Sequence, residues 1–426
     1  ANKSGVYNNP EIYGHGLMDL AAATSPVGQV SAMLGQNLYG PMTSAEFTSI
    51  HLTNPSFGDS ISRGLNNKSV IFFDELLAPF RRPLSGIISN YGNQIMSLHG
   101  YDEMDNYNTE TSITADSFFQ VGLSSYSNHS YELITPNHLL NTKSSNNQYF
   151  AYFNNAKNTF MSHGINAGWA LGIFQDEFLR SKINLRSKFN NPWMNFTAAG
   201  SAIGSIKTIN SNFDIAYTIS SGRNKFQSNE IFNDTNSSSV ALIEIQSKLA
   251  IPSLQIGLLT ENDSQMGLSG SGALNGQGNQ LTSFVGVTDS MDILGGKFFG
   301  SLYLGQTADS KNKTGMISSV NDLRSSSFGL GYLKSSIFNK NDLLTFTIDQ
   351  PIRVESGNLN LNVPVYRTKR KNVLFDSLNI NLSPSGREIN SKLEYSSSYK
   401  ILNYDFALGY KSDPYHIKYM DDYWYV

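Results

Sequence analysis

From about residue 190 to its end, the chain is a series of segments roughly ten residues long in which apolar and polar positions alternate. In the clearest segment, residues 358–363, every odd position is apolar and every even position is Asn. Successive side chains of a strand point to opposite faces, so this segment predicts a strand with one apolar face and one hydrogen-bonding face. Loops rich in Asn, Ser, Gly and Lys separate the segments, which together predict about twelve or thirteen strands.

The apolar sets of the other segments share a composition. Many begin or end in Tyr or Phe, and the polar positions between them are mainly Asn, Ser, Thr and Gly. The sets are Phe213, Ile215, Tyr217 and Ile219; Leu254, Ile256 and Leu258; Phe298, Leu302 and Leu304; Phe328, Leu330 and Tyr332; Leu344, Phe346 and Ile348; Ile389, Leu393 and Tyr395; and Leu402, Tyr404, Phe406, Leu408 and Tyr410. Aromatic residues that flank an aliphatic band are typical of outer-membrane barrels, which have a polar lumen and an even strand number.

We therefore expect an all-β fold, a transmembrane antiparallel β-barrel of about twelve strands with these sets facing lipid. A soluble β-sandwich or β-helix is the alternative. In the barrel, Leu361→Arg should impair membrane assembly and Asn360→Ser should not, because a lipid-facing Arg near the midplane costs about 2–4 kcal/mol.

The composition supports a wall with two unlike faces. Of the 426 residues, 15% are charged, below the roughly 25% of soluble domains, and 12% are aromatic. The net charge of −3 argues against a nucleic-acid partner. The absence of Cys excludes disulfides, thiolate zinc sites and Cys nucleophiles. No segment reaches the ~18–20 apolar residues of a membrane-spanning helix, and the first residues do not begin a signal peptide. We expect that a targeting segment has been removed or that the chain begins within a longer one.

Residues before the alternating segments have a different pattern. Residues 14–23 predict a glycine turn entering a short Ala-rich helix, and residues 69–75 predict an apolar strand. Residues 79–83 predict an extended linker, and residues 117–125 predict a further strand. Between about residues 131 and 165 we expect a segment inside the lumen, with 131–134 and 155–157 as its candidates.

Three pieces of the chain resemble the subtilisin-like serine protease autotransporters of Gram-negative bacteria. Residues 1–28, with Tyr13-Gly14-His15-Gly16 before an Ala-rich helix, look like the end of a subtilase catalytic domain. Residues 71–80 are similar to the segment that joins protease and barrel in that family. The third piece is near the end of the chain and comprises residues 349–357, 382–389 and 412–416.

The resemblance implies type V secretion by a translocator barrel in the cell outer membrane, with the N-terminal region at the cell surface. It implies three parts: residues 1–90, a C-terminal remnant of the subtilase passenger and a linker; residues 91–165, a connecting region with a possible pore segment; and residues 166–426, the translocator β-barrel. The implied partners are outer-membrane lipid, the upstream protease passenger (cleaved and still bound in one alternative) and the barrel-insertion machinery. This machinery would read the aromatic end at residues 423–426.

No catalytic residue, cofactor-binding residue or metal ligand is expected in this chain. The subtilase contexts Asp-x-Gly, His-Gly-Thr and Gly-Thr-Ser-x-Ala do not occur. The resemblance places residue 1 after the helix of the nucleophile, which implies that a Ser-His-Asp triad would lie upstream of residue 1. None of the seven His has a zinc-binding spacing. These are His15, His51, His99, His129, His138, His163 and His416.

Glycine-rich and charged segments near the strands have structural interpretations. The glycines of residues 267–278 predict a flexible hairpin loop, because no Lys-Ser/Thr follows as in a phosphate loop. Residues 384–387 predict a hairpin turn. Arg353, Arg387 and Glu388 either point into a lumen or lie at a water interface.

Three function classes remain open. The first is a translocator that carries and anchors its own passenger. The second is the non-catalytic part of a cleaved, surface-held subtilase that processes other surface proteins. The third is a porin-like or binding barrel. This chain belongs to a subtilisin-like serine endopeptidase only if the polypeptide upstream of residue 1 carries the Ser-His-Asp triad.

Overall fold

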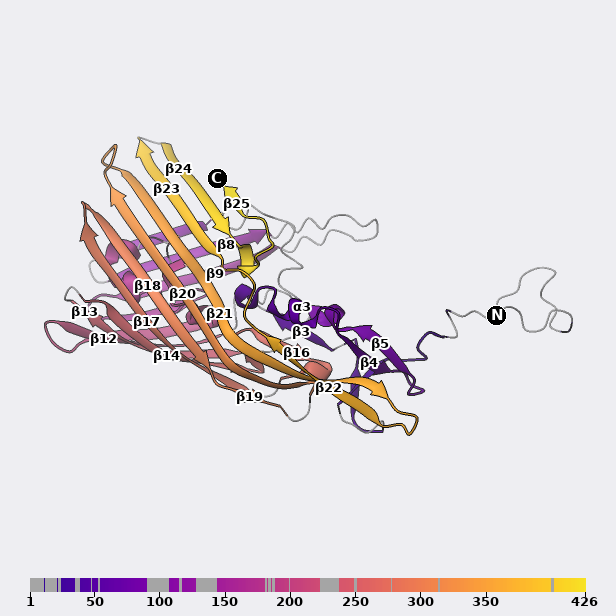
Figure 1. The fold of residues 1–426 in the computed structure, drawn as a ribbon. Coiled ribbons are helices and arrows are strands. Elements are labelled where there is room, and N and C mark those ends of the chain that lie inside the picture. The colour runs from indigo at the N-terminus through magenta and orange to yellow at the C-terminus, as the bar shows by residue number, and fades with distance from the viewer. Residues whose placement is uncertain are drawn as a thin grey trace.

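In the computed structural model, one large antiparallel sheet dominates the chain (Figure 1). Apart from short internal gaps, the structure describes residues 24–89, 107–127, 144–222, 237–399 and 402–426. Within these ranges the helices are few and short, which confirms the mainly β prediction. The helix expected over residues 14–23 falls, apart from one isolated residue, outside the described residues, as do His15, His99, His129 and His138.

The large sheet is built from neighbouring strands that pair antiparallel. They are β7 (Tyr107–Thr114), β8 (Ser117–Ser127), β9 (Ser144–Asn154), β10 (Thr159–His163), β11 (Ser201–Thr208), β12 (Phe213–Gly222), β13 (Ser238–Ser247), β14 (Ser253–Asn262), β17 (Asn279–Ile293), β18 (Gly296–Thr307), β19 (Ser310–Lys311), β20 (Ile317–Ser335), β21 (Asp342–Arg367), β22 (Val373–Asn381), β23 (Ile389–Tyr399), β24 (Leu402–Ser412) and β25 (Tyr423–Tyr425). From β10 the order follows the chain to β25 and continues with β7, β8 and β9. Because β9 also pairs with β10, the order is cyclic.

The sheet has more strands than the twelve expected, in part because residues 107–154 join it. The sequence assigns them to a connecting region, but they form β7, β8 and β9. The strand expected over residues 117–125 is confirmed as β8. Of the segments expected inside the lumen, residues 155–157 form an exposed turn between β9 and β10, which corrects that prediction. Residues 131–134 lie outside the described residues.

Strands β20 and β21 extend beyond the rest of the sheet. The first part of β21 pairs with β23, and the second part pairs with β22. The β20–β21 register shifts between Asn321 and Phe328, close to this change of partner. Beyond it, β21 and β22 run together away from the sheet wall (Figure 1). Residues 384–387 therefore do not form the expected hairpin turn, because they connect two strands that pair with different parts of β21.

The N-terminal region forms two small sheets and short helices beside this extension. Its elements are β1 (Ser31–Met33), β2 (Met42–Ser44), β3 (Ser49–Leu52), η2 (Pro55–Phe57), α3 (Ser60–Leu65), β4 (Ser69–Phe73), β5 (Pro79–Pro83), η3 (Leu84–Ile87) and β6 (Ile88–Ser89). Strand β4 confirms the strand expected from residue 69. Residues 79–83 are extended, but they pair with β4 as an edge strand and are not a linker.

The second small sheet joins the N-terminal region to the segment between β14 and β17. That segment contains β15 (Ser264–Gln265), β16 (Leu268–Ser271) and η6 (Gly272–Leu274), and β16 pairs with β3 from Leu52 to Ser49. The glycine-rich residues 267–278 are thus not a flexible hairpin loop. They supply a strand that holds β3.

One hydrophobic core fills the space between the N-terminal region and the extension of β20–β22. Strand β4 lies against β21, and α3 lies against β22. Leu359, Leu361 and Val363 are fully buried in the same core as Phe57 and Ile61. The lipid-facing prediction for residues 359–363 is therefore wrong. Alternation identifies an apolar face, but it does not say whether lipid or another part of the protein covers that face.

Candidate functional site

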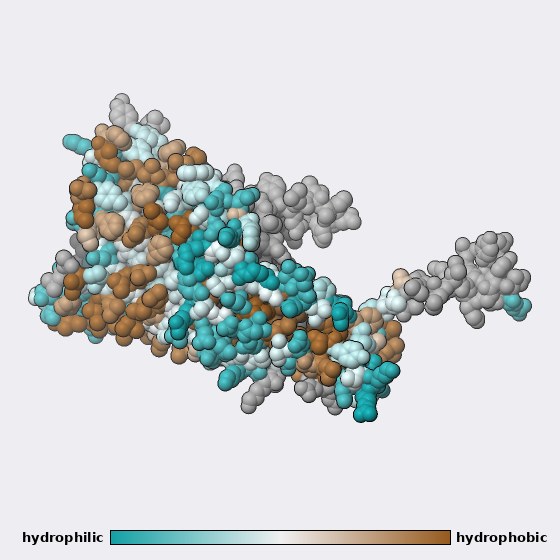
Figure 2. All heavy atoms as spheres, viewed as in Figure 1, coloured by the Kyte–Doolittle hydropathy of each residue, from teal (hydrophilic) through white to brown (hydrophobic). Residues whose placement is uncertain are grey.

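The large sheet has an exposed apolar face and a buried polar face. On β14, the exposed side chains of Leu254, Ile256 and Leu258 alternate with buried Ser253 and Gln255. The same arrangement continues over β13, β17 and β18. We call the exposed apolar side chains the outer band: Ile243, Ile245, Leu254, Ile256, Leu258, Leu281, Val285, Val287, Leu302 and Leu304. Apolar side chains cover much of the sheet wall in Figure 2. A water-soluble sheet would have the opposite arrangement.

Residues 164–200, which connect β10 to β11, cover the buried polar face. We call this segment the plug. It contains η4 (Gly172–Gln175), α5 (Glu177–Arg180) and η5 (Pro192–Thr197). Four of its aromatic side chains, those of Trp169, Phe174, Phe189 and Trp193, are at most 1% exposed, whereas Phe178 is 40% exposed. The segment therefore fills space against the sheet and does not form a surface loop.

A buried carboxylate of β13 binds the first turn of the plug. Glu244 is 0% exposed, and its Oε2 accepts hydrogen bonds from the Gly172 N–H (2.9 Å) and from Gln255 Nε2 (3.0 Å). Gln175 Nε2 donates to the other oxygen. Asn191 Nδ2 donates to Gln255 Oε1 (2.9 Å), so β14 also holds the second half of the plug. A buried carboxylate is costly unless donors surround it, and the plug supplies two of these donors.

Apolar and ionic contacts complete the attachment of the plug. Trp193 stacks on Phe284 of β17, with ring centroids 4.9 Å apart, and Phe189 meets Phe299 of β18 edge to face at 4.9 Å. Lys297 Nζ of β18 lies 2.6 Å from Asp176 Oδ2. The plug is thus attached to several neighbouring strands.

Local sequence signals explain the plug, although strand periodicity did not reveal it. Asn191 accepts from the Trp193 N–H (3.2 Å) and caps η5, which begins at Pro192, a residue suited to a first helical position. The plug also contains two of the three Trp of the chain. Residues 164–190 do not alternate. That interruption was the signal that could have separated the plug from the barrel region, which the resemblance placed at residues 166–426.

The third piece that resembles subtilase autotransporters consists of residues 349–357, 382–389 and 412–416. These three stretches come together where β21 and β22 extend beyond the rest of the large sheet. Arg353, 8% exposed, donates from Nε to the Gly386 carbonyl (2.9 Å) and from Nη2 to the Pro384 carbonyl (3.0 Å). His416, between β24 and β25, contacts both other stretches: its Nδ1 accepts from the Glu388 N–H (2.9 Å), and its Nε2 lies 3.1 Å from the Ile352 carbonyl. Arg353 and Glu388 are thus buried in protein, whereas Arg387 is partly exposed and bonded to Glu355.

The N-terminal region contacts this same place, which we call the junction (residues 349–357, 382–389 and 412–416). Asp59 Oδ1 accepts from the Ser385 N–H (2.9 Å), and Arg63 Nη2 donates to the Ser383 carbonyl (2.8 Å). Gly58 has φ of +47°, and a Cβ there would lie 2.7 Å from the Pro384 Cβ. This close approach requires glycine.

The junction predicts a pH-dependent stability. Burial lowers the pKa of His416 to about 4, and the opposing charge of Glu388 does not restore it. The two hydrogen bonds fit a neutral ring that donates from Nε2. As the pH is lowered, the His416 ring takes up a proton near pH 6.5 in the unfolded state but only near pH 4 in the folded state. The contribution of His416 is therefore complete above pH 6.5 and is lost as the pH falls toward 4.

We expect the urea concentration at the midpoint of unfolding to decrease as the pH is lowered from 7 to 4.5. Between pH 6.5 and pH 4, the contribution of His416 to the free energy of unfolding should change by about 3 kcal/mol. His416→Asn should lower stability at pH 7 and flatten this dependence. An equally steep profile in the variant would contradict the assignment.

Other candidate chemistry is not assembled in the described part of the chain. No group of three His, Asp or Glu side chains there could hold a metal ion. His51 Nε2 lies 2.8 Å from Ser49 Oγ and 3.2 Å from Ser271 Oγ, where it links β3 to β16. His163 Nδ1 lies 2.9 Å from Ser201 Oγ. Within those ranges, no helix has the length and apolar character to cross a membrane.

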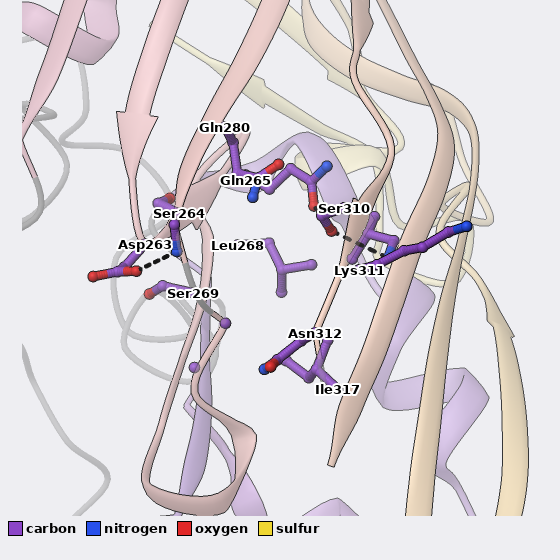
Figure 3. Close-up of a pocket in the computed structure, with 14 residues that line it drawn as sticks. Asp263, Ser264, Gln265, Leu268, Ser269, Gln280, Ser310, Lys311, Asn312 and Ile317 are labelled. Carbon is purple, nitrogen blue, oxygen red and sulfur yellow. Dashed lines mark hydrogen bonds between the residues drawn. The ribbon is translucent and has the colours of Figure 1, made fainter. Parts of the chain in front are cut away.

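A small cavity lies between the segment that contains β15 and β16 and the β19 segment (Figure 3). Its volume is about 40 Å³, and Gln265, Leu268, Ser310 and Asn312 are among its lining residues. Such a volume accommodates about one water molecule and is far below that of a typical small-molecule site.

No protein-family model, curated protein or solved structure matches the chain.

Proposed function

We propose that the large sheet is a closed outer-membrane β-barrel that serves as the translocator and surface anchor of a subtilisin-like autotransporter. The observation that carries this proposal is the arrangement of the two faces of the sheet, with aliphatic side chains exposed and polar side chains buried. A cyclic strand order supports it, because a barrel in lipid must leave no open edge.

The filled interior favours a translocator over a porin. A barrel of more than about eight strands is wider than its own inward side chains can fill, so it needs a further segment to exclude water. The plug supplies aromatic rings and hydrogen bonds to several strands. In this arrangement the barrel is at rest, and a chain in transit would require the plug to lie elsewhere.

The junction favours retention of the N-terminal region. Its helix α3 bonds to the junction, its strand β3 pairs with β16, and its apolar side chains complete one continuous core with β20–β22. This supports the second candidate function as well, in which the chain is the non-catalytic part of a surface-held subtilase. In both, residues 1–90 remain attached to the barrel.

Arginine substitutions in the outer band test the membrane proposal. Ile256 is 57% exposed, near the middle of β14. If lipid covers it, Ile256→Arg should reduce the free energy of unfolding in lipid vesicles by about 2–4 kcal/mol. The measurement is urea-induced unfolding of the refolded full chain, followed by heat-modifiable migration on gels.

The matched control is Thr260→Arg, on the same face but near the end of β14. Because the penalty falls to about 0–1 kcal/mol near the membrane surface, this variant should be nearly as stable as the unmodified protein. If water covers the band, both substitutions should stay within about 0.5 kcal/mol. That result would reject the membrane barrel.

A further inference from the structure

A cluster of positive charge lies at the tip of the β21–β22 hairpin, far from the plug. Four of the five residues from 367 to 371 are cations, in a chain whose net charge is −3. They are Arg367, Lys369, Arg370 and Lys371, and the last three are exposed. In the part of the chain that the structure describes, the recorded ion pairs do not involve any of these cations. The charges of the three exposed cations, Lys369, Arg370 and Lys371, are therefore directed to solvent.

Exposed tyrosine rings accompany the cations. Tyr39 is 69% exposed, and Lys371 Nζ donates to its hydroxyl at 3.0 Å. Lys371, and to a smaller extent Arg367, lower the pKa of this hydroxyl, which indicates a positive local potential. Tyr366 is 57% exposed and lies opposite exposed Leu374 on the hairpin. Cations and flat apolar rings are therefore presented together at one tip.

We propose that this tip (Tyr39, Tyr366, Arg367, Lys369, Arg370 and Lys371) is a binding site for an acidic polysaccharide. Lys and Arg pair with the sulfate, phosphate or carboxylate groups of such a chain. The tyrosine rings offer flat, largely apolar surfaces, with one polar end, against which the C–H faces of sugar rings can pack. A projecting hairpin tip reaches a flexible polymer more readily than a small ligand, which needs a concave site.

Two other anionic partners fit less well. The hairpin runs away from the sheet wall (Figure 1), and Lys369 is up to about 50 Å along an extended chain from Arg353, which lies level with Leu304 of the outer band. Lipid head groups at the wall are thus distant. A nucleic acid is disfavoured because the chain as a whole is negative.

Binding of a heparin oligosaccharide to the full chain refolded in detergent tests the site. The hairpin variant Lys369→Gln/Arg370→Gln/Lys371→Gln should bind about ten-fold more weakly than the unmodified protein, because three exposed charge contacts are lost. The control variant Lys311→Gln/Lys340→Gln/Lys418→Gln has the same net charge, with exposed lysines replaced elsewhere, and should bind normally. Added salt should weaken binding to the unmodified protein.

Each other outcome overturns the proposal. Equal heparin binding by the hairpin and control variants would remove the tip as the site. Equal binding of uncharged dextran would remove its electrostatic basis. Tighter, hairpin-dependent binding of anionic phospholipid vesicles or of a single-stranded oligonucleotide would assign the tip to another partner class. Heat-modifiable migration of both variants shows that they are folded, and none of these measurements depends on the barrel being a translocator.

Discussion

Deleting the plug should convert the proposed barrel into an open channel. The deletion is simple to design, because the Gly164 N–H already donates to the Gly200 carbonyl at 3.0 Å. A short turn can therefore replace residues 165–199 without separating β10 from β11. In planar lipid bilayers the unmodified protein should conduct little, whereas the deletion variant should show stable, large openings, because its wall encloses more space than inward side chains fill.

One substitution, with a matched control, gives the same test without a deletion. A Cβ at Gly172, whose φ is +61°, would lie 3.0 Å from Gln255 Nε2 and 3.2 Å from Thr288 Cγ2, so Gly172→Ala should disturb the turn bound to Glu244. Glu261→Gln is the matched control, because this second buried carboxylate accepts from Met266 and Gly267 and does not contact the plug in any recorded hydrogen bond. The deletion variant could be folded, as shown by heat-modifiable migration, and yet conduct no more than the unmodified protein. That result would contradict an interior closed by the plug.

Leu361→Arg should detach the N-terminal region without preventing membrane assembly of the proposed barrel. Leu361 is 0% exposed in the core shared by β21 and the N-terminal region, and it has apolar neighbours. An unpaired charge there should cost about 3–5 kcal/mol. We expect rapid proteolysis of residues 1–90, with heat-modifiable migration of the barrel preserved.

The control for this prediction is Leu374→Arg. Leu374 lies on the same hairpin but is 50% exposed, so the change should alter stability by no more than about 0.5 kcal/mol. Loss of membrane assembly in Leu361→Arg, with the N-terminal region still protected, would instead restore the lipid-facing interpretation of residues 359–363.

Alternation predicted the strands and their outward side chains, but not what covers each face. It placed Ile256 and Leu302 on an apolar face, and both are exposed. The same pattern at Leu361 marks a face buried by α3 and β4, because periodicity reports the geometry of one strand and not its neighbours. Polar residues 107–114 and 144–154 lacked a clear apolar alternation, so their membership of the sheet could not be foreseen.

The candidate sites were less predictable than the strands. The junction residues stand out as three separate stretches of sequence, but the contacts of Arg353 and His416 depend on a fold that joins positions tens of residues apart. The plug follows neither strand nor helix periodicity for more than a few residues. Its capping signal at Asn191-Pro192 identifies a short helical turn but not its location inside the sheet.

The continuity of β21 has a mechanical consequence. This strand runs unbroken from Asp342 in the wall to Arg367 at the hairpin tip, so the sheet wall and the hairpin that packs against the N-terminal region share one backbone. A pull applied along the hairpin would load the inter-strand hydrogen bonds of β20 and β21 in parallel, in shear, and would not open them one at a time. A tether of this kind resists a pulling force better than a flexible connector does.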